Sequence, residues 1–350
     1  EESIDFGGSD ISVTGVEGAE STLIDGTGSG DPVVSIMSGE TNASLAGFTL
    51  SVGDGYLEEA STTTWCTSIS QCTDYYSSYC GGGFYIADST ATLEEIIVSD
   101  NILPTSSTND VGDDTYYVFS YGGGGCVVNG TATLSGVVIE DNYADQGGGL
   151  FVDEDSSVTF SGGWFQANSA TDGGGVQVDG GYLSVENAVM AWNYAVDDGG
   201  SVLVTDGEVV LGNATVAGSS SNAGTGAELF LDGTSTGTVE NSILYGSGSA
   251  SVLYAFGIAT LDGTFNNVYS AAGSTTYDGV SDLTGTYGNL SVDPYFAGVS
   301  DDGDSSNDDW TLSNSSSCID AGNPAAGYSD ADGSRCDMGA YGGPDADWDQ

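Results

Sequence analysis

A phrase that opens with a run of glycines recurs along this chain at nearly constant intervals. The clearest copies are GGGFYI (81–86), GGGCVV (123–128), GGGLFV (147–152), GGGVQV (173–178), GGSVLV (199–204) and GAELFL (226–231). From the second copy onward they begin 24 to 27 residues apart. Self-similarity at such a period is typical of a solenoid, in which every repeat forms one turn of a coil and packs on its neighbours. The repeat limits the possible folds more than length or composition does.

Apolar residues occupy the same places in successive repeats, and within a repeat they alternate with a period of two. The aligned columns are Leu150, Val176 and Val202; Val152, Val178 and Val204; Val158, Leu183 and Val209; Phe160, Val185 and Leu211; and Val98, Ile139, Phe165, Met190 and Val216. Alternation places every second side chain on one face of a strand, and no stretch shows a sustained helical period. We therefore predict an all-β chain in which each repeat of about 25 residues contributes three short strands and three turns to one rung of a parallel β-helix.

An asparagine follows the last apolar column by three residues in four of the repeats. These residues are Asn101, Asn142, Asn168 and Asn193. Asparagines at the same corner of stacked rungs can bond to one another through their amides, as in the asparagine ladders of stacked strands. A ligand-binding row is the functional alternative, but the ladder needs no chemistry beyond the turn itself. We interpret the series as structural.

Two stretches interrupt the repeat, at about residues 55–80 and 103–121, and we expect both to be insertions at turns. The β-helix is predicted to span residues 1–300, with residues 301–350 as a closing segment packed on the last rungs. Strand-like alternation already begins at Ile4, which predicts an uncapped first rung. Because an open solenoid edge is a template for another chain, this suggests either a removed upstream cap or docking of copies into a filament.

The charge is extreme, with 52 acidic residues against one base, Arg335, no histidine, and a formal net charge of -51. Such a surface repels nucleic acid and anionic lipid and attracts cations, so Ca²⁺ is the expected cofactor and a saline habitat the alternative explanation. The candidate ligands are closely spaced carboxylates near glycines: Asp301, Asp302, Asp304, Asp330, Asp332 and Asp337. Solvated turns are the alternative for these residues, and Arg335 pairing with a neighbouring aspartate is the alternative for the second group.

The cysteines are even in number and lack zinc-type spacing, which favours disulfides and an oxidising compartment. They are Cys66, Cys72, Cys80, Cys126, Cys318 and Cys336. We predict the pair Cys318–Cys336, which closes a local loop, while a small Cys66–Cys72 loop would leave Cys80 with Cys126. No apolar run is long enough to span a bilayer, so we expect a secreted, extracellular or cell-surface protein without membrane insertion.

The outward positions of the first strand in each repeat are apolar where polar residues are expected. The aligned residues are Tyr85, Val127, Phe151, Leu203 and Phe230. An exposed apolar column along a rod is a candidate surface for lateral contact between copies. A covering loop, such as the cysteine-bearing insertion at 62–80, explains the column equally well. Both interpretations stay open.

The pairs GGGL with FQAN, GGGV with MAWN and GGGC with IEDN resemble the GGA[ILV] and FxxN repeats of polymorphic outer membrane proteins of the chlamydial type and related bacterial surface proteins. The similarity covers roughly residues 80–230, and glycine stands where the family has alanine in the first motif. The stretch CIDAGNPAAGYSDADGSRCDMGAYGG (318–343) resembles the closing segment of secreted bacterial β-helix proteins. The resemblance implies a single-stranded right-handed β-helix and a role in surface structure or adhesion.

We therefore expect a secreted structural protein of the bacterial surface, a self-assembling filament or matrix subunit stabilised by Ca²⁺ and disulfides, whose main partner is itself. One alternative is a monomeric adhesin-like passenger that binds a host or carbohydrate surface. The other is a polysaccharide lyase or hydrolase of β-helix fold. We do not expect an enzyme, because lysine and histidine are absent, so serine and cysteine nucleophiles lack the usual base and only carboxylates remain for acid–base work.

Overall fold

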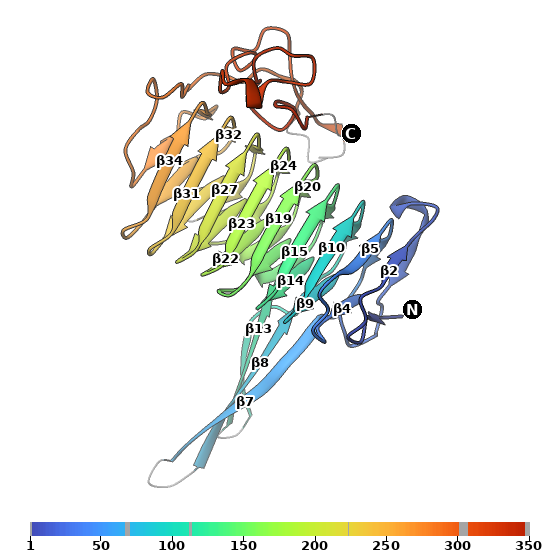
Figure 1. Ribbon diagram of the computed structural model, residues 1–350. Helices are drawn as coiled ribbons and strands as arrows, with labels where there is room; N and C mark the ends of the chain where they lie inside the picture. Colours follow the sequence, from blue (N-terminus) through green and yellow to red (C-terminus); the bar gives the residue numbers. More distant parts are fainter. Residues whose placement is uncertain (1, 67–70, 112–113, 223, 301–306, 347–350) are drawn as a thin grey trace.

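The computed structural model describes residues 2–66, 71–111, 114–222, 224–300 and 307–346, with the backbone alone for residues 58–66, 71–73, 110–111 and 114. It is a parallel β-helix, as predicted (Figure 1). Corresponding strands of successive rungs pair in parallel, and the rungs stack into a rod. No helix in the described part of the chain has the length and hydropathy to cross a membrane.

Three long sheets, here called A, B and C, form the walls of the rod. Sheet A contains β1 (Ile4–Asp5), β4 (Val34–Ile36), β9 (Phe84–Ala87), β14 (Gly125–Val128), β18 (Leu150–Val152), β22 (Val176–Asp179), β26 (Val202–Thr205), β30 (Leu229–Asp232), β33 (Leu253–Ala255) and β36 (Tyr277–Asp278). Sheet B contains β2 (Ser12–Thr14), β5 (Ala43–Ala46), β10 (Thr90–Glu94), β15 (Thr131–Ser135), β19 (Ser157–Ser161), β23 (Tyr182–Glu186), β27 (Glu208–Gly212), β31 (Thr236–Glu240) and β34 (Thr260–Thr264). Sheet C contains β3 (Leu23–Asp25), β6 (Thr49–Ser51), β11 (Ile97–Ser99), β16 (Val138–Glu140), β20 (Trp164–Gln166), β24 (Val189–Ala191), β28 (Thr215–Ala217), β32 (Ile243–Gly246) and β35 (Asn267–Ser270).

The inward columns read from the alternation are confirmed. Leu150, Val176 and Val202 are paired neighbours in sheet A and are fully buried. Phe165 and Met190 pair in the same way in sheet C. Residues of this kind from all three sheets make one continuous hydrophobic core inside the rod. Each rung therefore buries its apolar face only by stacking on its neighbours.

The predicted asparagine ladder is present at the corner that follows sheet C. The side-chain oxygen of Asn142 accepts from the main-chain N–H of Asn101 at 3.1 Å and from its amide at 3.0 Å. The same two bonds join Asn142 to Asn168 and Asn168 to Asn193. In the next rung Ser219 takes the corner, and its N–H donates to the carboxyl of Glu228 at 3.1 Å. A glutamate thus ends the ladder.

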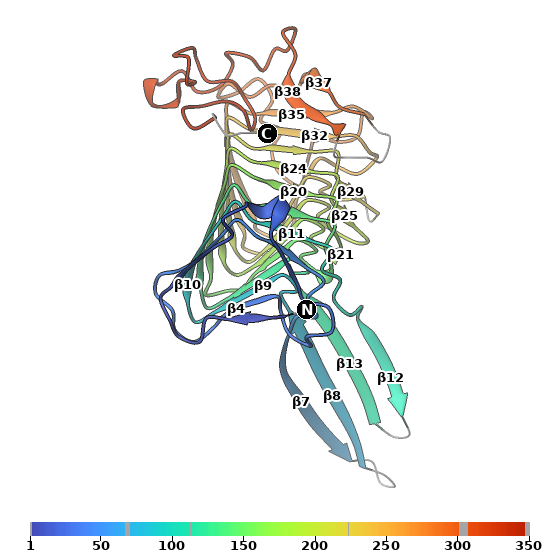
Figure 2. The ribbon, with the colours of Figure 1, turned by 90° about the vertical axis from the view of Figure 1, so that its right-hand side faces the viewer.

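A fourth sheet, sheet D, follows the asparagine corner. Its strands are β7 (Tyr56–Cys66), β8 (Gln71–Cys80), β13 (Asp114–Tyr121), β17 (Tyr143–Gln146), β21 (Ser169–Asp172), β25 (Tyr194–Ala195) and β29 (Ser220–Ser221), with β12 (Ser107–Val111) beside β13. The two stretches expected as insertions supply β7, β8, β12 and β13, which together project from the rod (Figures 1 and 2). We call these four strands the blade.

The chain beyond the last rung folds back along the outside of the rod (Figure 1). It contains a short antiparallel pair, β37 (Phe296–Gly298) and β38 (Asp309–Leu312). Trp310 of β38 is buried against Val189, Ala191 and Ala217, which lie on the outer face of sheet C. The closing segment therefore covers the side of several rungs.

Candidate functional site

The apolar column predicted on the outside of sheet A is not exposed. Tyr85 is 4% exposed, Val127 is fully buried, and Phe151, Leu203 and Phe230 are each 6% exposed. Tyr56 of β7 stacks on Tyr85, with 4.6 Å between ring centroids. The blade therefore covers the start of the column, which confirms the covering alternative there. The prediction of an exposed lateral contact surface is wrong.

Val127 was also assigned to the wrong face. Gly125 pairs with Phe84, so Cys126 pairs with Tyr85 and stands in the column, whereas Val127 pairs with Ile86 and points into the core. The chain has four glycines here, Gly122 to Gly125. A Cβ atom on Gly125 would lie 2.1 Å from the ring of Phe84. The extra glycine thus gives room to a large neighbour and shifts the strand by one residue.

Among the described cysteine side chains, one disulfide is formed, between Cys80 at the end of β8 and Cys126 in β14. It fastens the base of the blade to sheet A. The strand register sets Cys66 opposite Gln71 and Cys72 opposite Trp65, but the side chains of Cys66 and Cys72 lie outside the described residues.

The predicted pair Cys318–Cys336 is not formed, and both residues are buried free thiols. Their side chains have different surroundings, which explains the error. Cys318 packs with Ile243 and Met338, whereas the sulfur of Cys336 lies 3.3 Å from the side-chain nitrogen of Asn213. Burial raises the pKa of each thiol to about 11. Closeness in sequence did not decide the pairing.

The carboxylates proposed as Ca²⁺ ligands fall into two groups. Asp301, Asp302 and Asp304 lie outside the described residues. In the second group, Asp330 accepts from the N–H of Asp337 and of Gly343, and Asp332 accepts from the N–H of Ser334. Among the described residues, no group of three or more acidic, cysteine or histidine side chains is placed to hold a metal ion.

Asp337, the third candidate ligand, accepts from the N–H of Asp320. Burial, followed by the charges of nearby aspartates, raises the pKa of Asp337 to about 6. The guanidinium of Arg335 donates to the carbonyls of Gly322 and Ala321 at 2.7 and 2.9 Å. These bonds fold the closing segment upon itself.

The described part of the blade carries tyrosines in stacked pairs on neighbouring strands. Tyr75 of β8 stacks on Tyr116 of β13, and Tyr76 stacks on Tyr117, with centroid separations of 4.6 and 4.8 Å. Successive residues of a strand point to opposite faces, so one pair lies on each face of the blade. Tyr116 is 38% exposed. Each face therefore presents an aromatic surface with phenolic hydroxyls.

A column of left-handed residues forms the turn between sheets B and C, and we call it the turn column. Over the rungs from β10 to β31 its members are Glu95, Gly136, Gly162, Asn187, Asn213 and Asn241, all with φ between 45° and 62°. Glycine and asparagine adopt this conformation more readily than other residues do. The turn column runs along the rod from one rung to the next.

The asparagine half of the turn column holds the closing segment through main-chain groups around a turn at Gly339–Gly342. Asn187 donates through its amide to the carbonyls of Ala340 and Gly342 at 2.9 and 2.7 Å. Asn213 donates to the carbonyl of Asp337 at 3.2 Å. The carbonyl of Asn241 accepts from the N–H of Gly339 at 2.7 Å. Main-chain groups of the segment are thus bound by the corners of three successive rungs.

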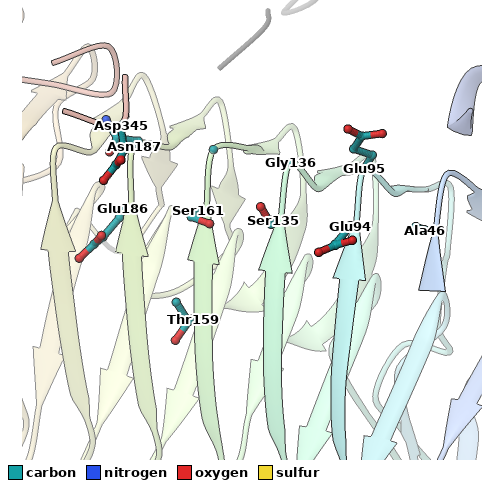
Figure 3. Close-up of a pocket in the computed structure, with 11 residues that line it drawn as sticks. Ala46, Glu94, Glu95, Ser135, Gly136, Thr159, Ser161, Glu186, Asn187 and Asp345 are labelled. Carbon is teal, nitrogen blue, oxygen red and sulfur yellow. The ribbon is translucent and has the colours of Figure 1, made fainter. Parts of the chain in front are cut away.

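The other half of the turn column lies in an open groove of about 710 Å³. Figure 3 shows the lining side chains at the ends of successive strands of sheet B, with Asp345 of the closing segment beside Asn187. The lining residues are Ala46, Glu94, Glu95, Ser135, Gly136, Thr159, Ser161, Gly162, Glu186, Asn187 and Asp345. The groove is therefore lined by acids, hydroxyls and small residues.

A buried glutamate, Glu228, lies at the end of the asparagine ladder. It is fully buried, and burial raises the pKa of its carboxyl well above the usual value. Its second carboxyl oxygen and the hydroxyl of Ser219 have no hydrogen-bond partner among the described residues. Burial therefore favours the neutral form of this carboxyl over the charged form.

Sequence reasoning missed the turn column, the groove and sheet D. The sequence did contain a signal for the turn column. Asn187, Asn213 and Asn241 recur at nearly the repeat spacing, each after the second strand of its repeat. The groove had no local signal, since its lining comes from five rungs and from the far end of the chain. Comparison with known proteins adds no assignment: no family model, curated protein or solved structure matches the chain.

Proposed function

We propose that the protein is a secreted structural protein of the bacterial surface, a rigid rod that presents the blade for contact with other surfaces. The observation that supports this most is the way in which the blade is mounted. It projects away from the rod (Figures 1 and 2), and its base is fixed by the Cys80–Cys126 disulfide and the Tyr56–Tyr85 stack. A braced projection suits the transmission of force better than a mobile loop does.

The base of the blade is also held by a buried carboxylate. Asp145 of β17 accepts from the N–H of Ser120 at 3.0 Å and from the N–H of Ser106 at 2.8 Å. These bonds fix both chain segments that enter and leave the second insertion. The blade and the rod are therefore joined by covalent, aromatic and hydrogen-bonded contacts at neighbouring rungs of the solenoid.

The chemistry of the blade favours a carbohydrate partner. Paired tyrosines offer flat apolar surfaces for the C–H faces of sugar rings and hydroxyls for their polar edges, and aromatic residues of this kind are enriched at contact surfaces. The net charge of -51 disfavours anionic polymers. A neutral polysaccharide is the partner class that we propose.

Cations are expected to screen the repulsion between neighbouring carboxylates. Asp172 lies near Asp197 and Asp198, and its pKa is raised first by burial and then by those charges. Like charges of this kind destabilise the folded state unless counterions screen them. We propose that Ca²⁺ or a high salt concentration supplies this screening, and that any assembly of copies joins the rods at their ends, because the lateral apolar column is covered.

The test combines electron microscopy with binding. The purified protein should appear as rods that keep their shape with and without chelator, and should bind immobilised neutral polysaccharides from a panel. A Tyr75→Ser/Tyr116→Ser variant, which keeps the second pair, should bind more weakly, whereas Tyr182→Ser, on the outer face of sheet B, should bind as the wild type does. Equal binding by wild type and both variants would remove the contact role from the blade.

A further inference from the structure

The turn column is continuous, yet the described residues of the chain occupy only part of it. Asn187, Asn213 and Asn241 hold the main chain of residues 337–342. The same column continues through Gly162, Gly136 and Glu95 along the open groove. We propose that this groove binds an extended, basic peptide segment of another protein, laid along the rod next to the closing segment. The proposal is independent of the contact role of the blade.

The occupied half shows what kind of ligand the turn column accommodates. The closing segment is bound mainly through its carbonyls and N–H groups, by corners of successive rungs. Three residues after Gly342, Asp345 of the same segment lies beside Asn187 and lines the groove (Figure 3). A peptide in the groove would therefore extend an intramolecular interface that the fold already makes.

The dimensions fit a short extended chain. The groove spans five strands of sheet B, from β5 to β23, because its lining runs from Ala46 to Glu186. Four intervals of ~4.8 Å give ~19 Å, which an extended peptide of roughly six residues covers. Gly136 and Gly162 keep the middle of the turn column free of side chains. Ser135, Thr159 and Ser161 add hydroxyls that both donate and accept.

The acidic lining of the groove favours a positively charged ligand. Glu94, Glu95, Glu186 and Asp345 line the groove. The one base of the chain, Arg335, is bonded to carbonyls within the closing segment. Any basic side chain that enters the groove must therefore come from another molecule. A second copy of this chain cannot supply a basic segment, because it too has a single base.

The experiment measures binding of a fluorescent peptide, (Lys-Ser)₅, to the full chain by anisotropy at low ionic strength. The double variant Glu94→Gln/Glu186→Gln removes two charges from the groove. The control Glu154→Gln/Glu208→Gln removes two exposed charges at the opposite edge of sheet B. Circular dichroism establishes that all three proteins are folded. A (Glu-Ser)₅ peptide and oligomers of an amino sugar are measured in parallel.

We expect the groove variant to bind (Lys-Ser)₅ about tenfold more weakly, since two partly exposed ion pairs are lost, and the control variant to bind as the wild type does. An equal loss in both variants would mean delocalised attraction to the acidic surface and would overturn the proposal. Groove-dependent binding of the amino sugar without binding of (Lys-Ser)₅ would overturn the assignment to a peptide. Binding of (Glu-Ser)₅ would contradict the electrostatic argument.

Discussion

Replacing Asn168 by alanine tests the structural role of the asparagine ladder directly. The side-chain oxygen of Asn168 accepts from the N–H and the amide of Asn142. Its own amide donates to the carbonyl of Ile139 at 2.8 Å and to Asn193 at 3.1 Å. The residue is fully buried, so water cannot replace these bonds without entering the core.

The magnitude follows from the groups that lose their partners. Alanine deprives the Asn142 N–H and the Ile139 carbonyl of these hydrogen bonds. At about 1–3 kcal/mol for each buried polar group left unpaired, the expected loss is about 2–6 kcal/mol in the free energy of unfolding. Asn168→Asp keeps the acceptor but turns an oxygen towards the side-chain oxygen of Asn193. It should therefore destabilise the fold to a similar degree.

Urea-induced unfolding followed by circular dichroism measures the effect. Solenoids can unfold in stages, so amide hydrogen exchange of residues 139–193 provides a local readout. The control is Asn42→Ala, because Asn42 is exposed and bonds to Asp10 through its main-chain N–H. A change within ~0.5 kcal/mol of wild type for Asn168→Ala, a value typical of surface substitutions, would refute the ladder as a source of stability.

Glu228→Gln should remove a loss of stability with rising pH. Because burial raises the pKa of Glu228, the contribution of its neutral carboxyl is fully present below the pKa of an unfolded glutamate, about 4.3, and is lost as pH rises through the folded-state pKa. Urea unfolding at intervals from pH 4 to pH 10 measures this, and parallel profiles for the two proteins would contradict it. Cys126→Ser opens a disulfide between residues 46 positions apart and should cost about 4 kcal/mol by chain entropy; reductant should destabilise the wild type by a comparable amount in thermal denaturation, and should leave the variant unaffected. The pKa of Asp337 is raised to about 6, so docking of the closing segment should be strongest when this group is neutral and should weaken as pH rises through about 6. Hydrogen exchange of the closing segment at pH 5 and pH 7 should show this weakening in the wild type and not in Asp337→Asn.

The local sequence pattern was sufficient to predict which residues fill the interior of the rod. Leu183 and Val185 alternate within one strand and recur in the next rung as Val209 and Leu211, because each rung must bury the same face against its neighbours. Asn168 could be assigned to a ladder for the same reason, since its partners are one repeat away in each direction. The repeat period of the sequence therefore predicts contacts between residues at the same position in adjacent rungs.

The local pattern failed wherever contacts depend on more distant or irregular features. The glycine run before Cys126 could be aligned in two ways, and the ring of Phe84 selects one of them. The short strand Tyr194–Ala195 of sheet D has too few residues to show alternation. An even number of cysteines limits the possible pairings but does not choose among them.

By itself, the sequence determined that this chain coils into stacked rungs with an apolar interior and asparagines at one corner. Tertiary structure alone decided that the closing segment returns over the turn column, where Asn187 meets carbonyls 153 and 155 residues away. It also decided that the apolar column is covered and that a groove stays open beside Glu94 and Glu186. The physical reason is that a repeat specifies pairing between adjacent rungs, whereas the outer surfaces are settled by segments that lie outside the repeat.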